Sequence, residues 1–328
     1  MNLKGVKPVA RVLAREVAVT ALLLLGVSVV VFGILYLSPG DPFSLLLEGQ
    51  MSAGVPGQDV REALGVPKAW YAQYLLWLAG MLRGNFGASI RTGLPVLEEI
   101  LRVGLNTLLL TLGSMAVTLL VAIPIALYAA VRGLNRVSFP LTMAAYVVSA
   151  LPVFWLGYVV IYLFMHKFGL FPLAFGSSGA ARGPNRLYLL LPIVVLGLGN
   201  GTLSEVIRHL REEMGRVLSE DYVRTARAKG ASVWKHAYRE GFLIPVTEIV
   251  ASKIPFLLGG AVIVEQVFNW PGMGRMAWQA AQDRDFPVIM GIAVIAAVFV
   301  RTGSLLQRFV YVAVNPGASR ETIERRTA

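Results

Sequence analysis

The chain has 328 residues and a formal net charge of +11 at pH 7, from 30 Lys and Arg against 19 Asp and Glu. Hydrophobic residues make up 56% of it and charged residues 15%, whereas soluble domains hold roughly 45–50% and 25%. Such a chain cannot bury its apolar surface in one soluble core, so its composition indicates an integral membrane protein. The absence of cysteine excludes disulfide scaffolds, thiolate metal sites and cysteine catalysis.

The first apolar run, Val17–Leu37, follows a basic N-terminal segment. Signal peptides also begin with basic residues, but their apolar core is only 7–15 residues long. This run is longer, and the sequence after it, Ser38–Pro42, offers no small-residue cleavage site. We therefore predict a transmembrane helix at 17–37, preceded by a cytoplasmic N-terminus at 1–16.

Residues 38–104 are mixed in composition and interrupted by Gly and Pro, which predicts an extracytoplasmic region. Within them, Trp70–Gly84 is apolar and aromatic but short, since a span needs about 20 apolar residues. We interpret this stretch as a helix that lies at the membrane interface.

Five more apolar runs follow, and each is long enough to span a bilayer: about Leu105–Val131, Phe139–Met165, Leu187–Ile207, Ile244–Val267 and Pro287–Val310. Membrane helices tolerate proline where neighbouring helices satisfy the freed backbone groups. The prolines concerned here are Pro124, Pro152, Pro192 and Pro255. Together with the first run, these segments predict an all-α integral membrane protein with six transmembrane helices.

The distribution of Lys and Arg predicts the orientation of the spans. With the N-terminus inside, the inner segments carry 17 of these residues and the longer outer segments carry 10. The inner segments are 1–16, 132–138, 208–243 and the tail after Val310, and the outer ones are 38–104, 167–187 and 266–286. Because basic residues concentrate in cytoplasmic loops, both termini are predicted to lie inside. The same distribution argues against nucleic acid as a partner, since no recognised binding module accompanies the charge.

One inner segment holds a polar stretch, Asp221–Pro245, between two apolar runs. Ser219 and Ser232 are predicted N-caps of two short helices, and Gly230 is predicted to end the first of them. Small residues surround the bend, so another protein could approach the backbone closely; they are Ala226, Ala228, Gly230 and Ala231. An ordinary solvated loop with the basic charges of an inner segment is the alternative interpretation.

The chain also resembles a known family over nearly its whole length. The blocks that carry the resemblance are "YLSPGDPF" (Tyr36–Phe43), "YAQYLLWLAGMLRGNFGASIRTGLPV" (Tyr71–Val96), "RTARAKGAS…FLIP" (Arg224–Pro245), "GGAVIVEQVFNWPGMG" (Gly259–Gly274) and "RDFP" (Arg284–Pro287). They are similar, in this order, to the B-type membrane permease subunit of dipeptide and oligopeptide ABC importers. Near its end the chain departs from the family pattern, with Arg308 and Asn315–Gly317 where relatives commonly carry aspartates.

The resemblance implies a type I ABC importer transmembrane domain, with a core at 105–328 and an EAA-type loop at 216–245. In that family the loop forms a coupling helix that sits in a groove on a cytoplasmic ATPase. Carried over to this chain, the contact residues are Arg224, Ala226, Ala228, Lys229, Gly230 and Ala231.

The outer loop Phe268–Gly274 is the second candidate contact. We expect its tryptophan and glycines to reach toward an extracytoplasmic substrate-binding protein, and a plain turn is the alternative. The candidate contact residues are Trp270, Pro271, Gly272, Met273 and Gly274.

Four charged residues fall in or near the predicted spans: Glu248, Lys253, Glu265 and Arg301. Charged side chains are costly inside a membrane and usually face a partner or a water-filled cavity. They either line the translocation pathway or a subunit interface, or they snorkel to the inner membrane surface.

The resemblance implies a permease subunit of an ATP-driven peptide importer in a bacterial or archaeal plasma membrane, forming half of the pathway. The implied partners are a homologous second permease, two cytoplasmic ABC ATPases, a substrate-binding protein and membrane lipid. ATP and Mg²⁺ are expected on the ATPases, because this chain has no Walker A motif. Its histidines, His166, His209 and His236, show no metal-ligand spacing.

Other functions are weighed against this one. The same architecture could carry nickel chelates, glutathione or sugars. A secondary transporter would usually show inverted repeats, and none is evident in the sequence. A membrane enzyme would need a convergent catalytic set, and none is evident either, so we predict a subunit without catalytic residues.

Overall fold

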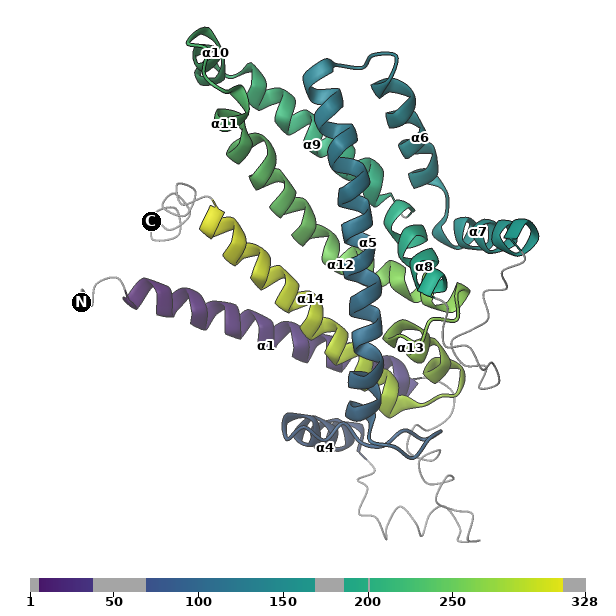
Figure 1. Ribbon diagram of the computed structural model, residues 1–328. Coiled ribbons are helices and arrows are strands. Elements are labelled where there is room, and N and C mark those ends of the chain that lie inside the picture. Colours follow the sequence, from purple (N-terminus) through teal and green to yellow (C-terminus); the bar gives the residue numbers. More distant parts are fainter. Residues whose placement is uncertain (1–5, 38–68, 169–185, 200, 315–328) are drawn as a thin grey trace. The chain divides into compact units, whose positions relative to one another are not determined.

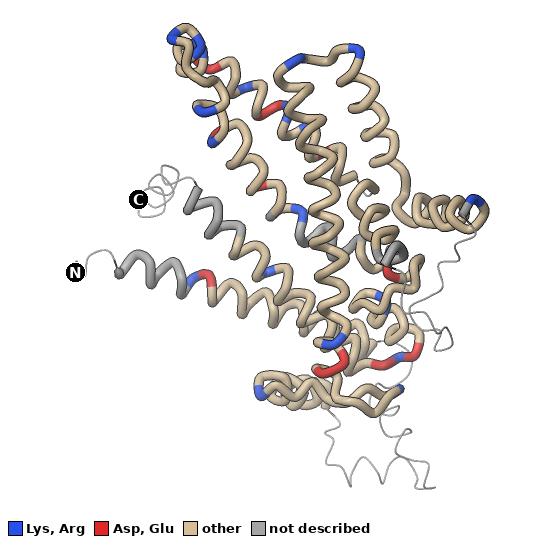
Figure 2. The backbone as a smooth tube through the Cα atoms, viewed as in Figure 1, with Lys and Arg blue, Asp and Glu red and all other residues tan. Residues whose placement is uncertain are grey.

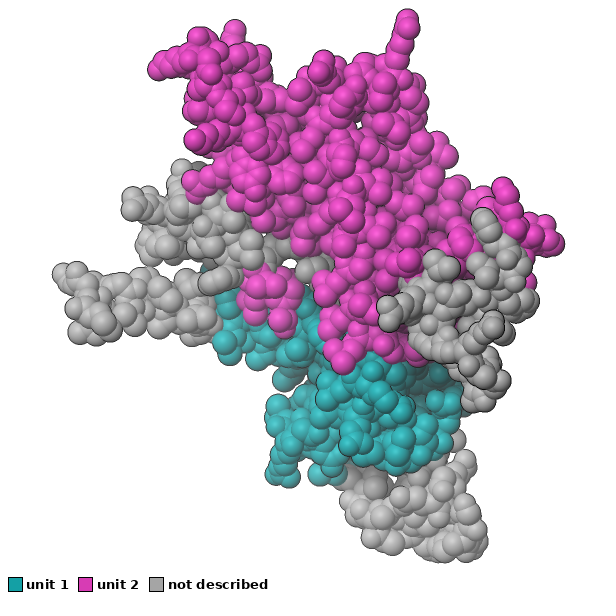
Figure 3. All heavy atoms as spheres, in the orientation of Figure 1, with its two compact units in different colours: residues 1–104, 276–301 teal, residues 105–275, 302–328 magenta. Residues whose placement is uncertain are grey.

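The computed structural model describes residues 6–37, 69–168, 186–199 and 201–314 of the chain (Figure 1). These residues form helices and turns, with one isolated bridge between Ala88 and Pro95 and no strand. Three parts of the predicted topology lie outside the described residues. They are 38–68 of the first outer region, most of the outer segment at 167–187, and the tail after 314. The chain forms two compact units: unit 1 is 1–104 with 276–301, and unit 2 is 105–275 with 302–328 (Figure 3).

Unit 1 is built on the first and last long helices of the chain. Helix α1 (Val6–Leu37) contains the predicted first span, and α14 (Phe286–Val314) contains the predicted last one. Helix α4 (Trp70–Leu82) confirms a short helix within the aromatic stretch. Phe32, Tyr74 and Met290 form a small core, and the hydroxyls of Ser28 and Tyr74 lie 2.9 Å apart, so α4 is held to α1.

Two of the sequence blocks that carry the resemblance pack against each other in unit 1. The Ser89 hydroxyl donates to Oδ2 of Asp285 at 2.5 Å, so the turn before α5 (Val96–Arg132) is tied to the start of α14. Gly291 has no side chain because a Cβ there would lie 2.7 Å from Val96 and 3.0 Å from Ile100. The close approach of the two segments depends on this glycine.

The third predicted span is broken in unit 2. The sequence predicted one continuous helix over Phe139–Met165, but the structure has α6 (Ser138–Ala150) and α7 (Val153–Phe168), bent by 103°. Pro152 disfavours helical backbone at the residue before it, and Leu151 is extended, with φ −72° and ψ 139°. The proline therefore interrupts the span.

The fourth predicted span is broken as well. Helix α8 (Arg186–Leu198) is followed by α9 (Thr202–Ser219) at a bend of 52°, and Gly201 at the break has φ +74°. Helix α9 continues well past the predicted end at Ile207. Its buried face carries apolar residues at helical spacing, among them Val206, Leu210 and Met214, and its other face is charged.

Backbone contact between α5 and α8 is close. Thr118 Oγ1 donates to the Gly197 carbonyl at 2.5 Å, and a Cβ on Gly197 would lie 2.6 Å from the Ser114 carbonyl oxygen. Small residues allow membrane helices to approach in this way. An apolar core lies beside this contact, formed by Leu110, Met115, Val153, Val195, Leu196, Ala261, Val264 and Trp270.

The remaining helices of unit 2 follow α9 directly. They are α10 (Asp221–Ala228), α11 (Val233–Tyr238), a π-helical turn η1 (Arg239–Leu243) and α12 (Ile244–Val267), before α13 (Met273–Gln282) at the unit boundary. Helix α12 has the bounds predicted from the sequence. Among the described residues, three helices are long and apolar enough to cross a membrane, or up to five if each bent pair counts as one span.

Candidate functional site

The polar stretch forms two short helices, as predicted, and the bend between them lies at Gly230. Gly230 has φ +72°, a backbone conformation that residues with a Cβ rarely adopt. The Ser232 hydroxyl accepts from the Lys235 amide at 3.5 Å, which confirms Ser232 as the second N-cap. The first predicted cap is wrong: Ser219 ends α9 and its hydroxyl donates to the Arg216 carbonyl, so Glu220 occupies the N-cap position of α10.

Most of the predicted ATPase-contact residues are exposed around this bend. Arg224, Ala228, Lys229, Gly230 and Ala231 lie at the surface of unit 2. Ala226 does not, and its assignment as a surface contact needs correction: it is 5% exposed. Val223, three residues earlier, is buried too, because residues three apart share a helix face.

A hydrogen bond fastens α10 to the beginning of the helix that leads into the membrane. The Tyr222 hydroxyl donates to Oε2 of Glu240 at 2.9 Å. Burial, followed by the hydrogen bond to Glu240, raises the pKa of Tyr222 to about 12, so the phenol keeps its proton at neutral pH. Trp234, Tyr238 and Phe242 contact one another along the following helix, with ring centroids 5.4–5.8 Å apart. These contacts order the helices on either side of the bend, while the bend itself is exposed.

The outer loop folds onto the buried carboxylate of Glu265. Its oxygens accept hydrogen bonds from Thr107 Oγ1 at 2.7 Å and from the Arg275 amide at 2.9 Å. Thr107 Oγ1 in turn accepts from the Met273 amide at 2.8 Å. Glu265 has no exposed surface. The side chain thus connects α12, α5 and the loop.

The structure places four of the five predicted loop contacts in the interior. Trp270 is 2% exposed, and its indole donates to the Asn106 carbonyl at 3.1 Å. Gly272, Met273 and Gly274 are buried, and Pro271 is half-buried. A Cβ on Gly272 would overlap the Glu265 carboxylate, so this glycine permits the close approach of the loop. Contact between the loop and a binding protein stays a prediction. The residues with accessible surface for such a contact are Pro271 and its neighbours Asn269 and Arg275.

Two of the charged residues in the spans have ionic partners. Lys253 pairs with Glu205 of α9 rather than with Glu248. Arg301 donates to Oε2 of Glu16 at 2.5 Å and to the Thr20 hydroxyl at 2.8 Å, which links α14 to α1 within unit 1. Glu248 is half-buried and makes no ion pair with the described residues. Lys253 and Arg301 thus each pair with a residue that the sequence analysis did not identify, Glu205 and Glu16 respectively.

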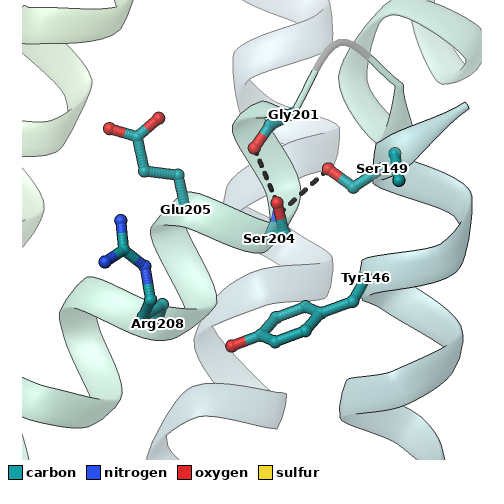
Figure 4. Close-up of a pocket in the computed structure, with 7 residues that line it drawn as sticks. Tyr146, Ser149, Gly201, Ser204, Glu205 and Arg208 are labelled. Atoms are coloured by element: carbon teal, nitrogen blue, oxygen red, sulfur yellow. Dashed lines mark hydrogen bonds between the residues drawn. The ribbon is translucent and has the colours of Figure 1, made fainter. Parts of the chain in front are cut away.

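A cavity of about 410 Å³ lies between α6 and α9 (Figure 4). The side chains around it include Tyr146 and Ser149 from α6, and Ser204, Glu205 and Arg208 from α9. The sequence analysis missed this site. Glu205 and Arg208, three residues apart at the end of a nominal span, were the signal that could have indicated it. Among the described residues, no three His, Asp or Glu side chains are grouped as metal ligands would be.

Comparison with known proteins shows which family contains these features. Residues 122–320 match the model of the binding-protein-dependent transport system inner membrane component, and residues 9–102 match its N-terminal membrane component. The chain belongs to this family. This transport component is therefore a protein of the inner membrane, and its family consists of transport subunits rather than enzymes.

Individual relatives of this transport component extend over most of its length. It is 36% identical to the oligopeptide transport system permease protein AppB of Bacillus subtilis, over 94% of this chain and 98% of the relative. It is 32% identical to the dipeptide transport system permease protein DppB of Alkalihalophilus pseudofirmus, over 84% and 90%. It is 36% identical to the glutathione transport system permease protein GsiC of Salmonella choleraesuis, over 89% and 94%.

Proposed function

We propose that this chain is one of two permease subunits of an ATP-driven importer for short peptides. Relatives of similar length carry oligopeptide and dipeptide transport in their names. The observation that carries the proposal is the exposed bend at Gly230, a polar surface that a cytoplasmic ATPase can contact. Movement of the ATPase would bias the permease between inward-open and outward-open arrangements.

The proposed complex contains a homologous second permease, two cytoplasmic ATPases and an extracytoplasmic substrate-binding protein, all within or against membrane lipid. ATP and Mg²⁺ belong to the ATPases in this proposal. Pro271 and the half-buried residues beside it, Asn269 and Arg275, offer the outer loop's surface to the binding protein. The buried Glu265 would keep that surface in one conformation.

The proposed topology has six spans with both termini inside. They are α1, α5, the pair α6 and α7, the pair α8 and α9, α12, and α14. Within unit 2, the basic residues of the turn from α5 to α6 and those of α10 and α11 lie toward the same end (Figure 2). This arrangement supports placing that end in the cytoplasm.

Glutathione is a second candidate substrate, because GsiC is as similar to this chain as AppB is. Nickel chelates and sugars remain further alternatives within the same architecture. All these substrates would use the same coupling surface, so the experiment on that surface is independent of the substrate.

The coupling surface is tested by Gly230→Asp, with Gly133→Asp as the matched control. Both glycines have positive φ, +72° and +68°, and neither has an atom within 4 Å of an added Cβ. Gly133 lies in the other inner turn. A Cβ at Gly230 or at Gly133 meets no described atom, and both substitutions strain a backbone of positive φ. A difference between the two variants therefore reports a partner seated on the bend.

We expect Gly230→Asp to weaken ATPase association by about 30-fold, as for an interface residue worth about 2 kcal/mol. Co-purification of the ATPases and ATP-dependent peptide uptake are the measurements. The Gly133 variant should keep ATPase association and uptake, because it introduces similar backbone strain away from the proposed ATPase contact. Normal uptake and normal ATPase recovery with Gly230→Asp would show that the stretch is an ordinary basic loop.

A further inference from the structure

The two helix breaks of unit 2 are joined to each other. The Gly201 amide, at the break between α8 and α9, donates to the Ser149 carbonyl at 2.9 Å, next to the break between α6 and α7. The Ser204 amide donates to the Ser149 hydroxyl at 3.2 Å (Figure 4). Non-helical backbone within a membrane occurs where it is buried in protein or lines a water-filled cavity. Here the joined breaks border a cavity.

The cavity has the size of a site for a small molecule. Its volume of about 410 Å³ lies within the roughly 300–1,000 Å³ of ligand pockets. Figure 4 shows the phenol of Tyr146 reaching from α6 toward α9. Glu205 and Arg208 extend from α9 on the side of that helix away from Tyr146. The lining of this one space therefore combines a phenol, two hydroxyls and side chains of opposite charge.

The charges around the cavity leave one cation available. Glu205 is paired with Lys253 of α12, whose side chain is only 12% exposed, so that carboxylate is neutralised from the side of α12. Arg208 is exposed and makes no ion pair with the described residues. Arg208 follows the predicted end of the fourth span at Ile207, and an arginine near the end of a span faces water or a partner. The guanidinium is thus positioned to receive an anion.

We propose that this cavity binds the free main-chain carboxylate of a peptide in transit, with Arg208 as the ligand for the carboxylate and Tyr146 as a hydrogen-bond donor. Guanidinium binds carboxylate with two parallel hydrogen bonds, which gives geometric specificity. Every unmodified peptide carries this carboxylate, so the site recognises peptides without reading their side chains. The proposal rests on the peptide-importer function proposed above.

Lys253 has a supporting role in this arrangement. Without it, the carboxylate of Glu205 would stand one helical turn from Arg208 and compete for the guanidinium, since residues three apart are neighbours on a helix. Lys253→Met should therefore weaken carboxylate binding even though Lys253 is not among the residues that line the cavity.

The absence of cysteine allows a direct test of occupancy in the intact complex. Ala150 lines the cavity and is exposed, so Ala150→Cys introduces the one thiol of this chain there, and labelling is followed on this subunit after the subunits are separated. Ala144, also exposed on α6 but outside the cavity lining, gives the control variant Ala144→Cys. The rate of labelling by a hydrophilic maleimide is measured with trialanine, with trialanine amide, and with neither. The complex is solubilised from membranes with its partner subunits.

We expect trialanine to slow labelling of Ala150→Cys at least fivefold, and trialanine amide to have little effect. Adding Arg208→Gln should abolish this protection. Adding Arg216→Gln should not, because Arg216 lies on the same helix but is paired with Glu213 outside the cavity. Labelling at Ala144→Cys should be indifferent to both peptides.

Three results would overturn the proposal. Equal protection by the amide would show that the carboxylate is not recognised. Absence of protection would show that the cavity holds no peptide. A thiol at Ala150 that never reacts would show that the cavity is covered in the complex and closed to a soluble peptide.

Uptake of radiolabelled peptides by the same complexes separates this inference from the proposed function. Uptake without protection refutes the cavity site and leaves the importer intact. Protection in a complex that takes up no peptide supports a binding site while contradicting the importer function.

Discussion

At the scale of single residues, Glu265 shows how a buried carboxylate can be stabilised without a cationic side chain bonded to it. Its described hydrogen-bond donors are the Thr107 hydroxyl and the Arg275 amide in the first turn of α13. Hydrogen bonds to a charged group contribute about 1.5–3 kcal/mol each. Two nearby glycines, Gly272 and Gly274, leave room for the loop to reach it. Packing inside this chain thus requires glycine at these two positions, without any contact to a partner.

The first prediction tests this close approach with Gly272→Ala. The added Cβ overlaps the Glu265 carboxylate, and overpacking of this kind costs about 1–3 kcal/mol. Gly215→Ala is the control, because nothing lies within 4 Å of a Cβ there and alanine favours the helix. Thermal unfolding of the purified subunit should show a lower Tm for the first variant and an equal or higher Tm for the second. An unchanged Tm for Gly272→Ala would contradict the packing described.

The second prediction concerns the ion pair of Arg301 with Glu16, whose side chains are 13% and 17% exposed. Removing one partner of a buried pair costs about 3–5 kcal/mol, because the other charge is left behind. Arg301→Leu and Glu16→Leu should each lower the Tm. The double variant should be more stable than either single one, and a double-mutant cycle measures the difference. Simple additivity would show that the two residues act independently.

At the scale of elements, proline alone does not decide where a span breaks. Pro124 lies inside α5 and Pro192 inside α8, yet both helices continue, whereas Pro152 separates α6 from α7. Around Pro124, Ala122 and Ala126 are fully buried against neighbouring helices. Packing of this kind holds a helix together across a proline. The sequence predicted the helical segments but could not distinguish these cases, because the packing is tertiary.

The third prediction concerns the contact between α5 and α8. Gly197→Val should force the two helices apart, since its Cβ would lie 2.6 Å from the Ser114 carbonyl oxygen. Gly26→Val is the control, as nothing within unit 1 lies within 4 Å of a Cβ at that helical glycine. Yield of monodisperse protein and Tm in detergent should fall for Gly197→Val and change little for Gly26→Val. Equal behaviour of the two variants would refute the close contact.

At the scale of the whole molecule, the fourth prediction concerns membrane topology, that is, which segments lie on the cytoplasmic side and which on the outer side. Reporter fusions at Val60, which lies outside the described residues, should report the outer side. Fusions at Lys229 should report the cytoplasm, because its segment is rich in Lys and Arg. Reporters on the same side at both positions would refute the arrangement of six spans.

Much of this molecule could be predicted from its sequence, because apolar runs and glycine signals act locally. The bounds of α12 and the bend at Gly230 follow from such signals. The burial of Ala226 follows from its spacing of three from Val223 on the same face of α10, whereas its small side chain had favoured a surface contact. Glu205 and Arg208 could have marked the position of the cavity, but its walls could not be predicted, because they depend on two breaks distant in sequence that share a hydrogen bond at Ser149.

The uninterrupted helical run from Val233 to Val267 has a mechanical consequence. At about 1.5 Å per residue it is a rod of roughly 50 Å, with the bend at one end and the outer loop at the other. Tyr222 fastens α10 to this rod through Glu240, while the extended backbone at Glu220 separates α10 from α9. Gly241, near the start of the rod, lies against Met214 and Val217 of α9. We therefore expect a force that a partner applies at the bend to pass along the rod and α9 together toward the outer loop.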